Sequence, residues 1–204
     1  MAVCQAQSFT PSECMQGFLV NQFLLLFLLI PLAVPVTIAS YSIVGEKSTR
    51  SLEPLLATPT STTEIIVGKA LASVIPAIGA TWLAFVIFLI GARFLAASAR
   101  VYALFMNPMW FVAMLIIAPL FTVLSVNVAI IISSRVSDPR AAEQIGMLVI
   151  LPIMLIFFGA ILGLIPLNTT TMLLLGAVTL LVDIGLVMLG VRLFQRETIL
   201  TQWK

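Results

Sequence analysis

Histidine is absent from this chain of 204 residues, and charged residues make up only 9% of it. Without histidine, the chain can hold neither a Ser-His-Asp or Cys-His catalytic site nor a metal ion with histidine ligands. Gly68-Lys69 does not complete a phosphate-binding loop, because Thr63 stands where that loop needs its first glycine. The only cysteines, Cys4 and Cys14, are equally consistent with a disulfide and with two free thiols. We therefore expect a chain that is not an enzyme and holds no metal.

Hydrophobic residues make up 61% of the chain, and its mean hydropathy is +1.20. Long runs without charge are typical of an integral membrane protein rather than of a soluble domain. The predicted fold is an all-α membrane protein, one transmembrane domain whose helices cover 18–43, 62–91, 108–133, 140–164 and 169–194. The rest is expected to form an extracellular tail (1–16), a cytoplasmic region (45–61) and a cytoplasmic C-terminal tail (195–204).

Proline and its neighbours mark the predicted starts and bends of these helices. Asn107-Pro108 and Asp138-Pro139 each place a capping side chain before a proline, which favours the first turn of a helix. Pro31 and Pro35 predict a kink in the first membrane helix. Residues 92–106 are expected to lie at the membrane interface before the third helix begins.

Small residues indicate where helices could pack closely. The second predicted helix carries such residues at spacings of three and four: Ala70, Ser73, Ala77, Ala80 and Ala84. A seam of this kind lets a neighbouring backbone approach, although alanines are common enough to fall in register by chance. The fourth helix has a second candidate packing face in Gly159 and Gly163.

Lysine and arginine set the expected orientation. With five crossings, one side of the membrane holds two basic residues, Arg93 and Arg100. The other side holds eight: Lys47, Arg50, Lys69, Arg135, Arg140, Arg192, Arg196 and Lys204. Because the richer side is cytoplasmic, we expect the N-terminus outside and the C-terminus in the cytoplasm. The chain is predicted to cross the plasma membrane several times. The expected membrane is the inner membrane of a bacterium or archaeon.

The longest polar interval runs from Gly45 to Lys69 and is too polar to lie in lipid. Ser61 and Glu64 fit a capping box, in which each side chain bonds a backbone N–H at the start of a helix. The next helix is therefore predicted to begin at Thr62. Polar intervals between membrane helices are usually solvated loops, so this helix start alone does not assign a function.

A short helix is predicted inside this interval, from Leu52 to Ala57. Pro54 fits only in its first turn, and Thr58-Pro59 forces the chain out of helix after it. Its apolar face would consist of three side chains: Leu52, Leu55 and Leu56. A short helix with an apolar face, followed by a corner and a long membrane helix, indicates a docking element on the cytoplasmic side.

The run LEPLLATPTSTTEIIVGK in this interval resembles the signature that follows the second membrane helix of ABC-type exporter permeases of the second type. The resemblance continues through Ser137–Ala141 and Leu193–Leu200 and covers residues 17–204. It implies that this region is a coupling helix resting on a separate ATP-binding cassette subunit, which holds ATP and magnesium. It also implies that a second permease copy or a homologue is a partner. The chain would further contact the lipid bilayer and would bind no nucleic acid. The implied coupling residues are Glu46, Arg50, Leu52, Glu53, Leu55, Leu56, Thr58, Pro59, Ser61 and Glu64.

The chain departs from that family in its helix count. Such permeases usually carry six membrane helices and a cytoplasmic N-terminus, whereas five helices and an external N-terminus are predicted here. We expect a permease that lacks its first helix, through truncation, a split gene or a misplaced start.

Asp183 and Asn127 are polar residues deep in predicted membrane helices. They precede Arg192 and Arg135 by nine and eight residues, which places them roughly 12–14 Å from the cytoplasmic helix ends. An ionised, unpaired acid at that depth costs several kcal/mol, so Asp183 should face protein or water. One interpretation is a polar lining of the substrate path with a protonatable step. The other is a bond that holds two helices together.

Two function classes follow. The chain is either the permease of an ATP-driven exporter, or a secondary transporter or non-transporting scaffold with Asp183 as its polar site. Many secondary carriers are built from inverted repeats, and the five segments show no pairing of halves, which favours the exporter. A path lined by Leu, Phe, Ile and Met would suit drugs, lipids or amphipathic peptides alike.

Overall fold

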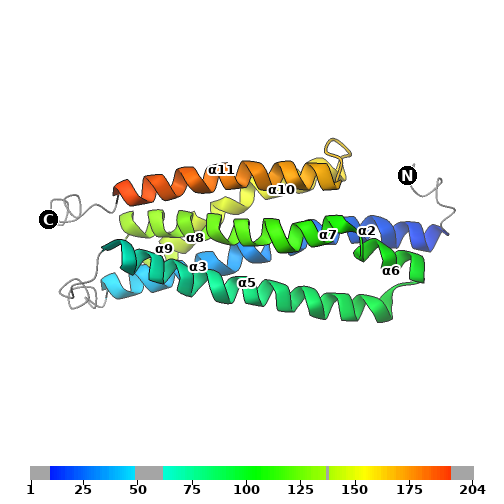
Figure 1. Cartoon of the computed structure of the whole chain (residues 1–204), viewed down its shortest axis with the longest axis horizontal. Helices are drawn as coiled ribbons and strands as arrows, with labels where there is room; N and C mark the ends of the chain where they lie inside the picture. The colour runs from blue at the N-terminus through cyan, green and yellow to red at the C-terminus, as the bar shows by residue number, and fades with distance from the viewer. Residues whose placement is uncertain (1–9, 49–61, 137, 194–204) are drawn as a thin grey trace.

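The computed structural model describes residues 10–48, 62–136 and 138–193, and every regular element in these ranges is a helix. Five stretches are long and apolar enough to cross a membrane: Pro11–Tyr41, Val67–Leu95, Ala99–Arg135, Pro139–Ile161 and Thr169–Gly190. The prediction of an all-α membrane protein with five spans is confirmed. Figure 1 shows these spans running side by side along the long axis of the molecule.

The first span consists of helices α2 (Pro11–Phe27) and α3 (Ile30–Ser48). It begins earlier than the predicted Phe18, because Thr10 and Glu13 form a capping box that was missed. The Thr10 N–H donates to Glu13 Oε2 at 2.9 Å, and the Glu13 N–H donates to Thr10 Oγ1 at 3.4 Å. The predicted kink occurs at Leu28–Leu29, where the chain leaves helix. Pro31 explains that position, because it has no N–H to offer the carbonyl one turn before it. Pro35, the other proline of this prediction, lies inside α3, which continues past it.

The second span is one continuous helix of 34 residues, α5 (Thr62–Leu95). Its first residue is the predicted one, while Ser61, the other half of the proposed capping box, lies outside the described residues. Ser73 and Ala77 of the small-residue seam are buried, so this part of the seam is a packing face. Ala80 is exposed and does not belong to that face.

The third span is assembled from four consecutive helical pieces: α6 (Ala99–Phe105), α7 (Pro108–Val112), the π-helical turn η1 (Ala113–Ile117) and α8 (Ala118–Arg135). Asn107 caps α7 as predicted, its Oδ1 accepting the Met109 N–H at 3.0 Å. Part of the expected interfacial stretch is helix α6, whose residues Val101 and Phe105 are buried. The third span therefore starts before the predicted residue 108.

The fourth span runs through α9 (Pro139–Gly146), the 3₁₀ turn η2 (Met147–Ile150) and α10 (Leu151–Ile161). Asp138 caps α9 as predicted, accepting the Arg140 N–H at 2.9 Å. The fifth span is α11 (Thr169–Leu193), which begins at its predicted residue.

Gly159 and Gly163 end the fourth span and do not form a packing face. Gly163 has a φ of +74°, the left-handed conformation in which many helices terminate. The N–H groups of Leu164 and Ile165 then turn back to the Gly159 carbonyl at 2.9 and 3.2 Å. A Cβ on Gly159 would lie 2.8 Å from Cδ1 of Ile165, so the returning chain fills the space beside this glycine.

Helix α8 lies at the centre of the bundle, where it packs against α3, α5, α9 and α11. The largest buried side chain, Trp110, belongs to the neighbouring α7 and is fully buried among four phenylalanine rings. Its ring centroid lies 5.5–6.2 Å from those of Phe27, Phe85, Phe88 and Phe105. We call this group the aromatic cluster. Helix α11 packs chiefly against α7, η1 and α8, and leaves its other faces exposed.

Candidate functional site

The predicted coupling region joins α3 to α5. Helix α3 ends at Ser48 and α5 begins at Thr62, at the end of the bundle where α11 also ends (Figure 1). We call this the α3–α5 end. Glu46 lies in the last turn of α3, and Glu64 is exposed in the first turn of α5. The other predicted coupling residues lie outside the described residues: Arg50, Leu52, Glu53, Leu55, Leu56, Thr58, Pro59 and Ser61.

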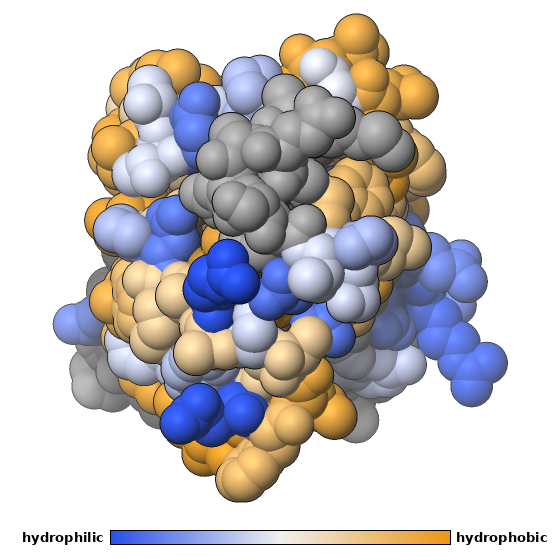
Figure 2. Space-filling view, turned by 90° about the vertical axis from the view of Figure 1, so that its right-hand side faces the viewer, coloured by the Kyte–Doolittle hydropathy of each residue, from blue (hydrophilic) through white to orange (hydrophobic). Residues whose placement is uncertain are grey.

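The opposite end of the bundle carries α6 and the start of α2. Figure 2 looks onto this end and shows hydrophilic residues between surrounding hydrophobic ones. The backbone N–H of Ala97 donates to Gln16 Oε1 at 2.9 Å, and the guanidinium of Arg93 lies 5.4 Å from the centre of the Tyr102 ring. Cys14, near the start of α2, is disulfide-bonded. The only other cysteine, Cys4, lies outside the described residues.

Asp183 and Asn127, predicted separately from their depth, meet where α11 packs on α8. The Asn127 amide donates to Asp183 Oδ1 at 3.5 Å, the long limit of a hydrogen bond. Asp183 is only 4% exposed, and its Oδ2 is buried without a hydrogen-bond partner among the described residues. This contact has the geometry of an interhelical bond. A role for the two residues in the substrate path stays a prediction.

A second interhelical bond lies between α3 and α9, and the sequence did not single out its residues. The Thr37 hydroxyl donates to Glu143 Oε1 at 2.7 Å. The two helices approach closely at the same place, since a Cβ on Gly146 would lie 2.7 Å from Cγ1 of Val36. Glu143 could have been recognised as an acidic residue inside the fourth apolar stretch, which spans Pro139–Ile161.

Buried hydroxyl groups line the contacts among α3, α5 and α8. Those on α5 and on the first turns of α8 bond to their own helices: Thr81 to the Ala77 carbonyl at 2.8 Å and Thr122 to the Ala118 carbonyl at 2.9 Å. Other buried hydroxyls have no hydrogen-bond partner among the described residues: Ser40, Ser125 and Ser133. The described residues contain no group of acidic or cysteine side chains able to hold a metal ion.

Comparison with known proteins returned one family. A family model described as ABC-2 family transporter protein matches residues 5–191, which is most of the chain. No curated protein and no solved structure matches this chain.

Proposed function

Because the chain belongs to the ABC-2 family of transporter proteins, we propose that it forms the membrane half of an ATP-driven exporter. It is a multi-pass membrane permease component of an ABC transporter. In the proposed assembly, two permease copies rest on two ATP-binding subunits, which bind ATP with magnesium and hydrolyse it. The apolar residues of the bundle suit an amphipathic substrate such as a drug, a lipid or a peptide, moved outward.

The observation that carries this proposal is the length and position of α5. Its 34 residues extend for about 51 Å, whereas the hydrocarbon core of a bilayer is about 30 Å thick. The helix starts at Thr62, inside the polar interval, and packs on both α3 and α8. A displacement applied at Thr62 would therefore reach the centre of the bundle through one rigid element.

The contact with the ATP-binding subunit is proposed to involve the predicted helix over residues 52–57. Leucines left in water would forgo roughly 2 kcal/mol each, so an apolar face in a polar interval favours a covering partner. In this proposal, Leu52, Leu55 and Leu56 enter a groove on the partner. The charged side chains of Glu46, Arg50 and Glu53 surround them, which is the usual anatomy of a protein interface.

Replacing Leu55 and Leu56 together with aspartate tests this contact. The double variant should insert normally but no longer copurify with a coexpressed ATP-binding subunit, because two charges cannot enter an apolar groove without a large desolvation cost. The matched control replaces both residues with methionine, which conserves apolar volume and should preserve binding. If the aspartate variant binds with unchanged affinity, the interval is an ordinary solvated loop.

A subtler variant separates binding from coupling. Ser61→Ala with Glu64→Ala removes the proposed capping box, at a cost of about 1 kcal/mol to the start of α5. Binding of the ATP-binding subunit should persist, while the stimulation of ATP hydrolysis by substrate weakens. Equal stimulation in the variant and the unmodified protein would mean that the start of α5 does not transmit the signal.

The buried carboxyl group of Asp183 favours a second candidate, a secondary transporter with an ion site between α8 and α11. Its Oδ2 has no partner among the described residues, so a bound proton or cation would meet an available oxygen. Transport into proteoliposomes distinguishes the two functions. The exporter requires ATP and its partner subunit, whereas the secondary transporter would work with an ion gradient alone.

A further inference from the structure

The π-helical turn η1 interrupts the third span between α7 and α8. In this turn the Ala118 N–H is bonded to the carbonyl of Ala113, five residues back, instead of to that of Met114. The next N–H along the chain would belong to residue 119, but residue 119 is proline and has none. The Met114 carbonyl is thereby left without a backbone donor. In a membrane such a group must find a partner within the protein.

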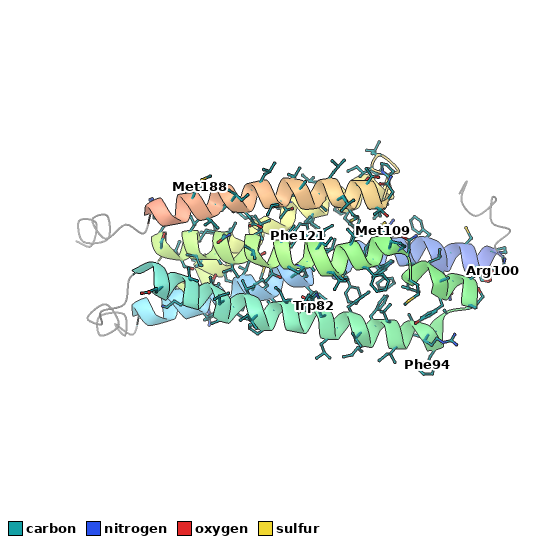
Figure 3. All side chains as sticks on the ribbon, viewed as in Figure 1. Trp82, Phe94, Arg100, Met109, Phe121 and Met188 are labelled. Atoms are coloured by element: carbon teal, nitrogen blue, oxygen red, sulfur yellow. The ribbon has the colours of Figure 1, made fainter. Side chains whose placement is uncertain are left out.

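Trp82 of α5 supplies that partner. Its indole Nε1–H donates to the Met114 carbonyl at 2.9 Å. Figure 3 labels Trp82 near the middle of α5, where this helix runs beside the third span. The Trp82 side chain is 43% exposed and Met114 is fully buried, so the bond leads from the surface of α5 into the bundle.

We propose that Trp82, Met114 and Pro119 form a joint between the second and third spans, in which Trp82 positions α5. Pro119 withdraws the backbone donor, the π-helical turn presents the Met114 carbonyl, and the indole N–H takes the place of the missing donor. Single π-helical turns are frequent at functional sites, since they leave backbone groups that pair outside their own helix.

The surroundings of the joint suit a positioning role. One turn further along α5, Phe85 stacks on Trp110 with the ring planes 10° apart, within the aromatic cluster. Five residues before Trp82, Ala77 is fully buried in the small-residue seam. Neither of these contacts is directional along the helix axis, whereas a hydrogen bond to one carbonyl defines the height and rotation of α5. The indole N–H of Trp82 thus forms a hydrogen bond between α5 and the third span.

A double-mutant cycle tests the joint through stability alone. Trp82→Phe keeps an aromatic ring and removes the N–H, so the ratio of folded to unfolded protein in mixed micelles should fall roughly three- to tenfold. Pro119→Ala returns a backbone N–H to the third span and gives Met114 a donor again. In that background Trp82→Phe should change the ratio of folded to unfolded protein by less than about twofold, which is the usual effect of a surface substitution on stability. An equal fall in both backgrounds would overturn the proposal.

Two controls make the result specific. Pro152→Ala removes a proline from the fourth span, so the effect of Trp82→Phe in that background should be unchanged. A smaller effect of Trp82→Phe in the Pro152→Ala background would mean that removing any proline weakens the effect by loosening the bundle. That result would count against the proposed joint. Hydrogen exchange of the Trp82 indole N–H, assigned by loss of its signal in Trp82→Phe, needs no proline variant. Exchange should be slow, and exchange at the rate of free indole would contradict the proposed bond.

The role of the joint in transport rests on the proposed function. If α5 carries the signal, Trp82→Phe should weaken the stimulation of ATP hydrolysis by substrate, and the double variant with Pro119→Ala should regain it. If the stability cycle behaves as expected while stimulation stays unchanged, Trp82 does not position α5 for coupling. The proposed function is judged separately, by the binding of the Leu55 and Leu56 variants.

Discussion

Gly146 of α9 lies against Val36 of α3, and replacing it with alanine is a direct test of how closely the first and fourth spans pack. The added Cβ would lie 2.7 Å from Cγ1 of Val36, whereas carbon atoms in contact are about 3.5–4.0 Å apart. Val36 is fully buried and β-branched, so its side chain can neither leave nor rotate freely. The helices must therefore separate.

The expected change in stability on replacing Gly146 with alanine is the difference between two effects. Overpacking of this kind costs about 1–3 kcal/mol, and the higher helix propensity of alanine returns up to about 1 kcal/mol. With a mid-range overpacking cost of about 2 kcal/mol, the net destabilisation should be about 1–2 kcal/mol, or roughly 2–8 °C in Tm for a chain of this size. The neighbouring bond between Thr37 and Glu143, 2.7 Å long, should lengthen as α3 and α9 move apart.

The assay is thermal unfolding of the purified protein in detergent, with Gly185→Ala as the matched control. Gly185 is an exposed glycine of α11 with nothing within 4 Å of the position of a Cβ, so its replacement should be neutral or slightly stabilising. Val36→Ala removes the clashing methyl group, so Gly146→Ala should cost little in that background. Equal Tm values for Gly146→Ala and Gly185→Ala would refute the close approach of α3 and α9.

Two further predictions concern the membrane site and the topology. Asp183→Asn should leave assembly intact but change transport or its dependence on pH if Asp183 lines the substrate path; if the variant instead loses folded protein while transport per molecule stays normal, the contact with Asn127 is structural. Single cysteines at Ser51 and Thr201, in a background without native cysteines, should react with impermeant reagents only from the cytoplasm, and one at Ser8 only from outside. Labelling of Ser8 from the cytoplasm would contradict the five-span topology.

Helix starts were the part of the fold most open to prediction, because each one depends on a local pattern. Asn107-Pro108 and Asp138-Pro139 cap their helices as predicted, and α5 begins at Thr62. The capping box of Thr10 and Glu13 uses the same pattern, yet the weakly polar tail around it concealed the helix start at Pro11. The signal is present in the sequence, since Thr10 and Glu13 have the spacing of a capping box.

Contacts between spans were less open to prediction, because apolar sequence does not record which helices are neighbours. Asn127 and Asp183 were found from depth, but their meeting depends on α11 packing beside α8. Pro119 signals that a backbone carbonyl will lack its donor. The sequence does not reveal that Trp82, 32 residues before Met114, provides the replacement. The coupling roles of all the predicted residues stay predictions, and those from Arg50 to Ser61 lie outside the described residues.

The one-sided packing of α11 bears on how the chain is built in the membrane. Of the buried residues in the main core cluster, α11 contributes only Met172, so the other four spans enclose nearly the whole cluster without it. Helices that have inserted separately associate by lateral movement in the bilayer. The fifth span can therefore join a bundle that the other four spans have already formed.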